Sequence, residues 1–291
     1  MAQTIGRSEI RVGLIDGPIA LAHAELAEAR LIPLGDVPAG CDGASSSACR
    51  HGTFVAGMLC ARRGGAAPAI CPGCTFLICP IFRGSASASS KVLAERIIMA
   101  VDAGAKLINL SIGSQSISSS GDQILWQALD HAALTGAVIV AAVGNQGVIG
   151  SSAITRHPAV ISVLGTDLRG RPLQRTNLGA TSARRGVAAP GTGVTSISPD
   201  GGTVTLSGTS VAAPIVTGAL ALLWSKFPGI SAVMLRDALV PRGRGRVIMP
   251  PMLDVRTAYA QLAALYTGGY PRWPTNLASR KRQIPRWWLP S

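Results

Sequence analysis

Short apolar runs alternate with stretches of helical periodicity along most of this chain of 291 residues. The runs are mostly apolar, and they lie at 9–16, 75–82, 106–113, 137–145 and 159–166. Continuous apolar runs of this length are typical of strands buried on both faces, as in parallel sheets covered by helices. The sequence therefore predicts a single α/β domain with a doubly wound, mostly parallel sheet and helices on both faces.

The segments between and after these runs predict the rest of the domain. We expect helices from about His51 and over 92–104, 122–136, 209–227, 231–240 and 255–266. Residues 35–50 are a polar loop, and 186–191 and 203–208 are short strands or loops. We place the main α/β domain at 1–241, followed at 242–291 by a C-terminal helix and an irregular basic tail that contains Trp and Pro.

Composition permits a large core, since 47% of the residues are hydrophobic and 14% are charged. No apolar run reaches about 18 residues, the length that spans a bilayer, and the first residues lack a segment typical of a signal peptide. The sequence thus predicts a cytoplasmic protein without a membrane segment.

The chain carries 27 Lys and Arg against 14 Asp and Glu, a net charge of +13. Such a charge suits nucleic acid, an acidic surface or an acidic peptide. The sequence contains no zinc-finger or RNA-recognition signature, which disfavours nucleic acid. The basic residues are scattered until the C-terminal stretch RKRQIPRWW, so an acidic peptide partner is the favoured interpretation.

Six cysteines lie between residues 41 and 79, at Cys41, Cys49, Cys60, Cys71, Cys74 and Cys79. Cys71 and Cys74 form a CxxC pair, but no second CxxC or His pair accompanies it, which disfavours zinc. Free buried thiols and one or two disulfides both remain open. A reducing cytoplasm would favour thiols.

The stretch LSGTSVAAPIV opens the long helix predicted at 209–227. Gly208 allows a sharp turn or a close approach, and Pro214 is tolerated only near a helix start or at a bend. Ser210 would lie at the positive end of the helix dipole, which suits a hydroxyl that develops negative charge. An ordinary N-cap serine is the alternative, because Ser210 needs a base, an orienting group and oxyanion donors to act as a nucleophile.

Candidates for these partners occur along the chain in the order Asp16, His51, Asn145, Ser210. Asp16 and Asn145 fall at the carboxyl ends of predicted strands, where sites of parallel sheets lie. The motifs VGLIDG, HGTFVAGML, NLSIG, AAVGN, APG and LSGTSVAAP resemble, in this order, the subtilisin-like serine proteases, the subtilases, over about 8–227. The order Asp, His, Ser is that of subtilisin.

The resemblance implies a role for each catalytic candidate. Ser210 matches the nucleophile, His51 the general base, and Asp16 the carboxylate that orients the imidazole. Asn145 matches the side-chain donor of the oxyanion hole, with the Ser210 N–H as the second donor.

Substrate-binding residues are implied in the same way. Ser111, Ile112 and Gly113 match the strand that pairs with an extended substrate, while Ala142 and Gly144 match a wall of the pocket for the residue before the scissile bond. His23, His131 and His157 have no such support, and we interpret them as ordinary surface or loop residues.

The sequence departs from the family pattern at three places. Gly17 and Pro18 follow Asp16 where Thr-Gly or Ser-Gly is usual, and Phe54 replaces the second His of the helix motif, which should alter packing rather than chemistry. Residues 61–69 match a calcium loop of many subtilases but contain no Asp or Asn. Calcium prefers carboxylate oxygens, so we predict no metal and no cofactor.

Within the family, the DGP turn, the ICPGC…LICPIF stretch and VDAGAKLINLSIG are most similar to the leader-removing subtilases of cyanobactin biosynthesis. This similarity implies a maturation endopeptidase that acts on a ribosomally made precursor. We expect the basic tail to hold an acidic leader of that precursor. A general degradative protease is the alternative, and an inactive peptide-binding module is the alternative from another class. A tail that is merely solvated, with its tryptophans packed on the catalytic domain, also remains open.

Overall fold

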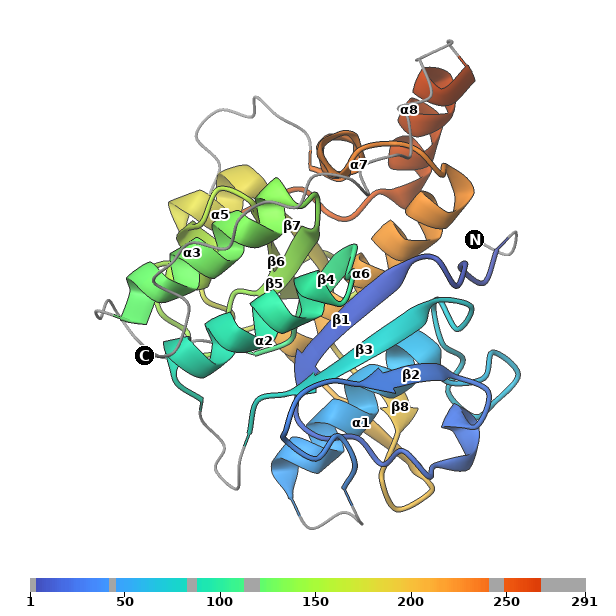
Figure 1. Cartoon of the computed structure of the whole chain (residues 1–291). Helices are drawn as coiled ribbons and strands as arrows, with labels where there is room; N and C mark the ends of the chain where they lie inside the picture. The colour runs from blue at the N-terminus through green and yellow to red at the C-terminus, as the bar shows by residue number, and fades with distance from the viewer. Residues whose placement is uncertain (1–3, 42–45, 83–87, 113–120, 241–248, 268–291) are drawn as a thin grey trace, which may run out of the picture.

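A seven-stranded parallel sheet forms the centre of this computed structural model, which describes residues 4–41, 46–82, 88–112, 121–240 and 249–267 (Figure 1). Its strand order is β2-β3-β1-β4-β5-β6-β7. The strands are β1 (Arg11–Asp16), β2 (Arg30–Pro33), β3 (Thr75–Pro80), β4 (Leu107–Leu110), β5 (Val138–Ala142), β6 (Val160–Thr166) and β7 (Gly186–Pro190). The predicted doubly wound sheet is confirmed.

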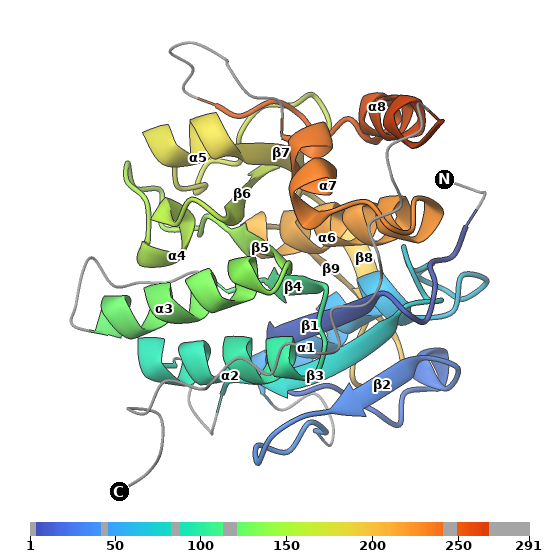
Figure 2. The ribbon, with the colours of Figure 1, turned by 45° about the horizontal axis from the view of Figure 1, so that its top comes forward.

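Helices cover both faces of the sheet (Figure 2). The side chains of β5 show the division, since Val138 and Val140 face α1 (Ser47–Cys60) and α6 (Thr209–Lys226), whereas Ile139 faces the other layer. That layer contains α2 (Ser90–Asp102), α3 (Gly121–Leu134) and α4 (Ala153–Arg156). Because the side chains of a strand alternate between the two faces of the sheet, a continuous apolar run packs against both helix layers.

Four elements were not anticipated from the sequence: β2, the short helices α4 and α5 (Ala180–Arg185), and β8 (Val194–Ile197), in addition to a 3-10 turn, η1 (Ala24–Leu26). β8 pairs antiparallel with β9 (Thr203–Leu206), and β8 packs against α1. The helix expected from about His51 begins one turn earlier, at Ser47. The Ser46 hydroxyl accepts the Cys49 N–H at 2.9 Å, so the polar loop itself supplies the N-cap.

The described part of the C-terminal region packs on the sheet domain. Residues 251–253 exchange two backbone hydrogen bonds with Ala188 of β7, and α8 (Val255–Thr267) follows α7 (Ala232–Leu239). Ala258 and Leu262 of α8 are fully buried in the core on the α6 side. The remaining residues of the predicted C-terminal region, 242–248 and 268–291, lie outside the described residues.

One described helix, α6, is long and apolar enough to span a membrane by length and composition alone. However, 83% of it is buried inside the protein, between the sheet and α1, α7 and α8. Small residues such as Ala212, Ala213 and Gly218 let it approach its neighbours, which is how a core helix is built.

Candidate active site

Asp16 and His51 form a hydrogen-bonded pair at the carboxyl end of β1. The Asp16 side chain is fully buried, and its Oδ1 lies 2.7 Å from Nδ1 of His51 in α1. The same oxygen accepts the Gly17 N–H at 2.6 Å. This contact leaves Nε2 as the imidazole nitrogen that is available to a substrate or a nucleophile.

Two glycines bring α1 against this strand end. A Cβ at Gly17 would overlap the carbonyl oxygen of Ala48, and one at Gly52 would lie 2.5 Å from the carbonyl oxygens of Gly17 and Pro18. The unusual Asp16-Gly17-Pro18 turn thus has a steric cause, because the start of α1 lies directly on it. The close approach sets the separation of Asp16 and His51.

The electrostatic environment of His51 has two opposing parts. Burial lowers the pKa of His51, while the charge of Asp16 and its hydrogen bond raise it, and the net pKa is above the ordinary value. The side chain is 27% exposed, so a reactant can still reach the ring.

The start of α6 combines Ser210 with Asn145. Gly208 precedes the helix at φ +148°, a conformation that favours glycine, and Ser210 is the second residue of α6. Asn145 follows β5, and its Oδ1 accepts the Thr209 N–H at 2.9 Å. The amide Nδ2 lies next to the Gly208 backbone, since a Cβ at Gly208 would approach it to 3.1 Å, and the amide oxygen rather than Nδ2 makes the bond to Thr209.

The sheet brings these residues to one edge. β1, β4 and β5 are neighbours, so Asp16, Ser111 and Asn145 all lie at carboxyl ends of adjacent strands. α1 packs against α6, which brings the helices of His51 and Ser210 together. The predicted carboxylate, imidazole, hydroxyl and amide therefore come from elements that meet at one edge of the sheet, and their joint role in acyl transfer stays a prediction.

The predicted substrate strand follows β4. Ser111 is buried, and its Oγ accepts from Asn109 Nδ2 at 2.8 Å, while the Thr217 hydroxyl of α6 donates to Asn109 Oδ1 at 2.8 Å. The Ser111 side chain therefore faces inward and leaves its backbone for other contacts. Ile112 is half-buried, and Gly113 lies outside the described residues.

The two residues predicted for the pocket wall have different surroundings. Ala142 ends β5 and is buried in the core on the α6 side. Gly144 is also buried, at φ +102°, and its carbonyl accepts the Asn177 N–H at 3.0 Å. Their predicted role toward a substrate side chain stays a prediction.

Among the described residues, no group of three or more His, Cys, Asp or Glu could hold a metal. In the loop that matches a calcium site, the Arg63 guanidinium donates to the carbonyls of Ala69 at 3.4 Å and Ile70 at 2.7 Å. A guanidinium thus occupies carbonyls that would otherwise be free to bind a cation. Phe54 is fully buried in the core, consistent with a packing role.

The cysteines divide into two sets. Cys41 and Cys49 form a disulfide that joins the polar loop to the first turn of α1, while Cys60, Cys71, Cys74 and Cys79 are free and buried. Burial raises the pKa of Cys79 to about 12, which makes this thiol unreactive at neutral pH.

The other histidines lie outside the site. His157 and His23 are loop residues but are buried rather than on the surface. His157 contacts Asp130 at 3.1 Å, and burial lowers its pKa despite that carboxylate. His131, in α3, lies 3.2 Å from Asp102.

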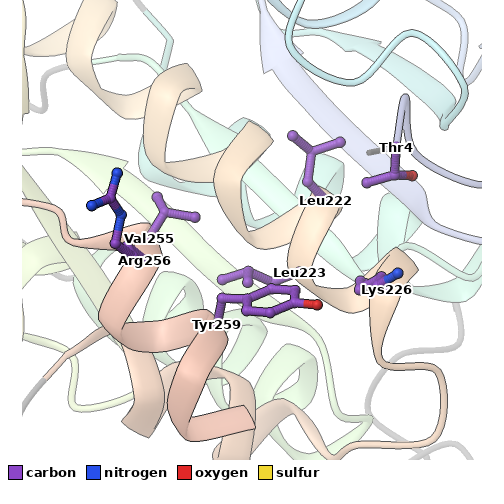
Figure 3. Close-up of a pocket in the computed structure, with 7 residues that line it drawn as sticks. All are labelled: Thr4, Leu222, Leu223, Lys226, Val255, Arg256 and Tyr259. Carbon is purple, nitrogen blue, oxygen red and sulfur yellow. The ribbon is translucent and has the colours of Figure 1, made fainter. Parts of the chain in front are cut away.

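A groove of about 400 Å³ lies at the opposite end of α6 from Ser210 (Figure 3). Leu222, Leu223 and Lys226 of α6 line one side, and Val255, Arg256 and Tyr259 of α8 line the other, with Thr4 nearby. The groove carries no nucleophile paired with a base, so it is not part of the catalytic site.

Sequence reasoning missed the polar residues that support the site. Thr209 holds Asn145 and accepts the Gly144 N–H on its hydroxyl at 3.2 Å, and Asn177 contacts the loop around Asn145. Thr209 stands inside the Gly-Thr-Ser motif, so its position next to Ser210 was a usable signal. Asn177 lies in a loop far along the chain, and nothing in its local sequence marks it.

Comparison with known proteins gives consistent results. The chain matches the Subtilase family over residues 8–246. Subtilisin DY from Bacillus licheniformis is 32% identical over 240 residues, or 82% of this chain and 85% of the relative.

Solved structures agree with the family match. A mutant of the PatA protease domain superposes with a TM-score of 0.84 at 32% identity, covering 93% of this chain and 99% of that chain. The prenylagaramide maturation protease PagA superposes with a TM-score of 0.80 at 29% identity, covering 90% and 96%. This chain belongs to the subtilase family and is a subtilisin-like serine protease.

Proposed function

We propose that the chain is an endopeptidase that uses Ser210 as its nucleophile and His51 as its base. Ser210 Oγ attacks the scissile carbonyl carbon while His51 Nε2 takes the hydroxyl proton. Asp16 holds the ring through Nδ1 and stabilises the imidazolium that forms. The 2.7 Å contact between Asp16 and His51 is the observation that carries this assignment.

The tetrahedral intermediate places negative charge on the former carbonyl oxygen. Asn145 Nδ2 and the Ser210 N–H would donate to this oxyanion, at the positive end of α6. Collapse breaks the C–N bond, and the departing amine takes the proton from His51. Water, activated by the same imidazole, then hydrolyses the acyl-enzyme and regenerates the Ser210 hydroxyl.

Replacement of the nucleophile tests this mechanism. Ser210→Ala should abolish both turnover of a peptide substrate and covalent labelling by a fluorophosphonate, with an unchanged Tm. A folded variant that is still labelled would show that the nucleophile lies elsewhere. A wild-type protein that neither turns over peptides nor becomes labelled would be an inactive binding module.

We further propose that its substrate is a ribosomally made precursor from which it removes a leader. Support comes from the likeness to PatA and PagA over at least 90% of this chain, since PagA is described as a maturation protease. The net charge of +13 suits an acidic leader. A maturation protease should cut such a precursor at one site and leave denatured casein largely intact, as mass spectrometry of the products would show. Broad casein cleavage would indicate a degradative protease.

The predicted role of the basic tail belongs to this proposal, although residues 268–291 are outside the described part. If the tail holds the leader, deletion of 270–291 should raise KM for the full precursor and leave kcat on a short peptide unchanged. The defect should shrink as salt is added, because exposed charges are screened beyond about 8–10 Å. Equal losses on both substrates would mean that the tail is structural.

The cytoplasm stays our predicted compartment. The Cys41–Cys49 disulfide is an observation against it, because disulfides are rare in reducing compartments. Thiol alkylation in intact cells tests the prediction, which requires Cys41 and Cys49 to be reduced and modifiable there.

A further inference from the structure

Two loops lie side by side next to the proposed oxyanion donor. Residues 143–150 follow β5 and contain Asn145, and residues 175–178 belong to the connection between β6 and α5. Their backbones exchange hydrogen bonds, from Gly147 to Arg175 at 2.8 Å and from Leu178 to Val148 at 3.0 Å. The second loop therefore braces the segment that carries the catalytic amide.

The side chain of Asn177 makes four further hydrogen bonds to that segment. Its Nδ2 donates to the Val143 carbonyl at 3.0 Å and to Gln146 Oε1 at 2.6 Å. Its Oδ1 accepts the N–H groups of Gln146 at 3.0 Å and Val148 at 3.3 Å. Asn177 is 7% exposed, so these bonds are shielded from water, and they hold residues on both sides of Asn145.

Gly144 shows how closely Asn177 approaches the loop. A Cβ at this position would lie 2.6 Å from Asn177 Nδ2 and 2.5 Å from Gln146 Oε1. The Asn177 amide is packed closely against this loop, and both its Nδ2 hydrogens and its Oδ1 are hydrogen-bonded to it. The loop therefore has few alternative conformations.

The amide of Asn145 is held from two directions. Thr209 binds its oxygen from the α6 side, while Asn177 sets the path of the backbone from which it projects. We infer that Asn177 is a positioning residue of the oxyanion hole, which keeps Val143–Val148 in the shape that aims Asn145 Nδ2 at the developing oxyanion. This inference rests on the proposed function, because it assigns Asn145 to the oxyanion.

The direct test is Asn177→Ala, measured with a short peptide substrate and a peptidyl boronic acid that mimics the tetrahedral state. We expect kcat to fall about 10- to 100-fold with little change in KM, since a small displacement of a catalytic group costs about this much. Affinity for the boronic acid should fall by the same factor. Thr176→Val is the matched control, because the Thr176 hydroxyl is buried in the same loop but donates to the Gly165 carbonyl and not to residues 143–148.

A double-mutant cycle separates positioning from general stability. In an Asn145→Ala background, adding Asn177→Ala should change kcat by less than about twofold, because Asn177 acts through the amide that is already missing. The inference would be overturned if the fold-loss of kcat in the double variant equalled the product of the losses in the two single variants. It would also be overturned if kcat were unchanged in folded Asn177→Ala. A folded Ser210→Ala protein that retains activity would instead contradict the proposed Ser210 mechanism, on which the inference about Asn177 depends.

If Asn177→Ala does not fold, Gln146→Ala tests the inference in its place. Gln146 is exposed, and its side chain receives one of the two Asn177 donor bonds. Its loss should lower kcat and boronic acid affinity in the same direction by a smaller factor. No change in either quantity would overturn the inference.

Discussion

The two ends of α6 are built from different residues and serve different purposes. At its start the chain reads Gly208-Thr209-Ser210, and Gly208 and Thr209 lie against the Asn145 amide. At its end, Leu223 lies beside Tyr259 of α8, and Leu222 lines the same groove on the side of Thr4 (Figure 3). The helix has 18 residues and is therefore about 27 Å long.

The physical reason for the difference is the direction of the helix. The start offers unpaired N–H groups and a partial positive charge, which stabilise an oxyanion. The end carries a partial negative charge, which Lys226 in the last turn complements. Substitutions at the start should therefore change kinetics, and substitutions at the end should change stability.

The largest effect is expected at the carboxylate that orients His51. Asp16→Asn should reduce kcat/KM by about 10⁴-fold, because the imidazole loses its charge partner and its tautomer. In the wild type, kcat/KM should rise with pH through the His51 pKa, above its ordinary value of about 6.5, because the neutral ring is the base.

The same pH experiment checks the sign of the shift. Without the Asp16 charge, burial alone should lower the His51 pKa, so the residual activity of the variant should titrate at lower pH than that of the wild type. The raised pKa also stabilises the folded wild type at low pH, and this contribution should be lost as pH rises through it. An identical acid limb in both proteins would contradict the assignment of His51.

The next effect lies at the start of α6. Asn145→Ala should lower kcat about 100- to 1000-fold with a small change in KM, the usual cost of one oxyanion-hole donor. The measurement is steady-state kinetics on a short peptide, with Tm as the control for folding. A loss confined to KM would assign Asn145 to ground-state binding.

The opposite end should respond in the opposite way. Leu223→Ala removes a side chain that is 3% exposed, so the free energy of unfolding should fall by about 2–5 kcal/mol. kcat per folded molecule, obtained by active-site titration, should be unchanged. Val233→Ala on α7 is the control, because Val233 is 61% exposed and should change stability by less than about 0.5 kcal/mol. A lowered kcat per folded molecule in Leu223→Ala would show that the end of α6 also affects catalysis, which contradicts the proposed difference between the two ends.

The smallest effect concerns the middle of α6, where the side chain of Ile70 lies over Gly218. Arg63 holds the Ile70 carbonyl, and we predict that this loop needs no metal. A chelator should leave both Tm and activity unchanged. A fall in Tm on chelation, reversed by calcium, would show that a cation supports this loop.

Much of the site followed from local sequence. Asp16 and Asn145 stand at the ends of apolar runs, and parallel strands place such ends at one edge. Ser210 follows a glycine at the start of a long helix. The supporting residues did not follow in the same way, because the contacts of Asn177 with the Asn145 loop join positions about 30 residues apart.

The local periodicity of the sequence thus determined the parallel sheet. The order of the sequence motifs determined the family resemblance and the identity of the catalytic candidates. Only the tertiary structure decided three other features. Ser46 caps α1 one turn before the predicted start, the Ala48 carbonyl leaves no room for a side chain at residue 17, and the Asn177 side chain binds the loop that contains Asn145. Strand burial and helix amphipathicity are properties of neighbouring residues, so a sequence reveals them. A close approach of two backbones or a buried amide bound to a distant loop depends on how the finished elements pack, which no local pattern encodes.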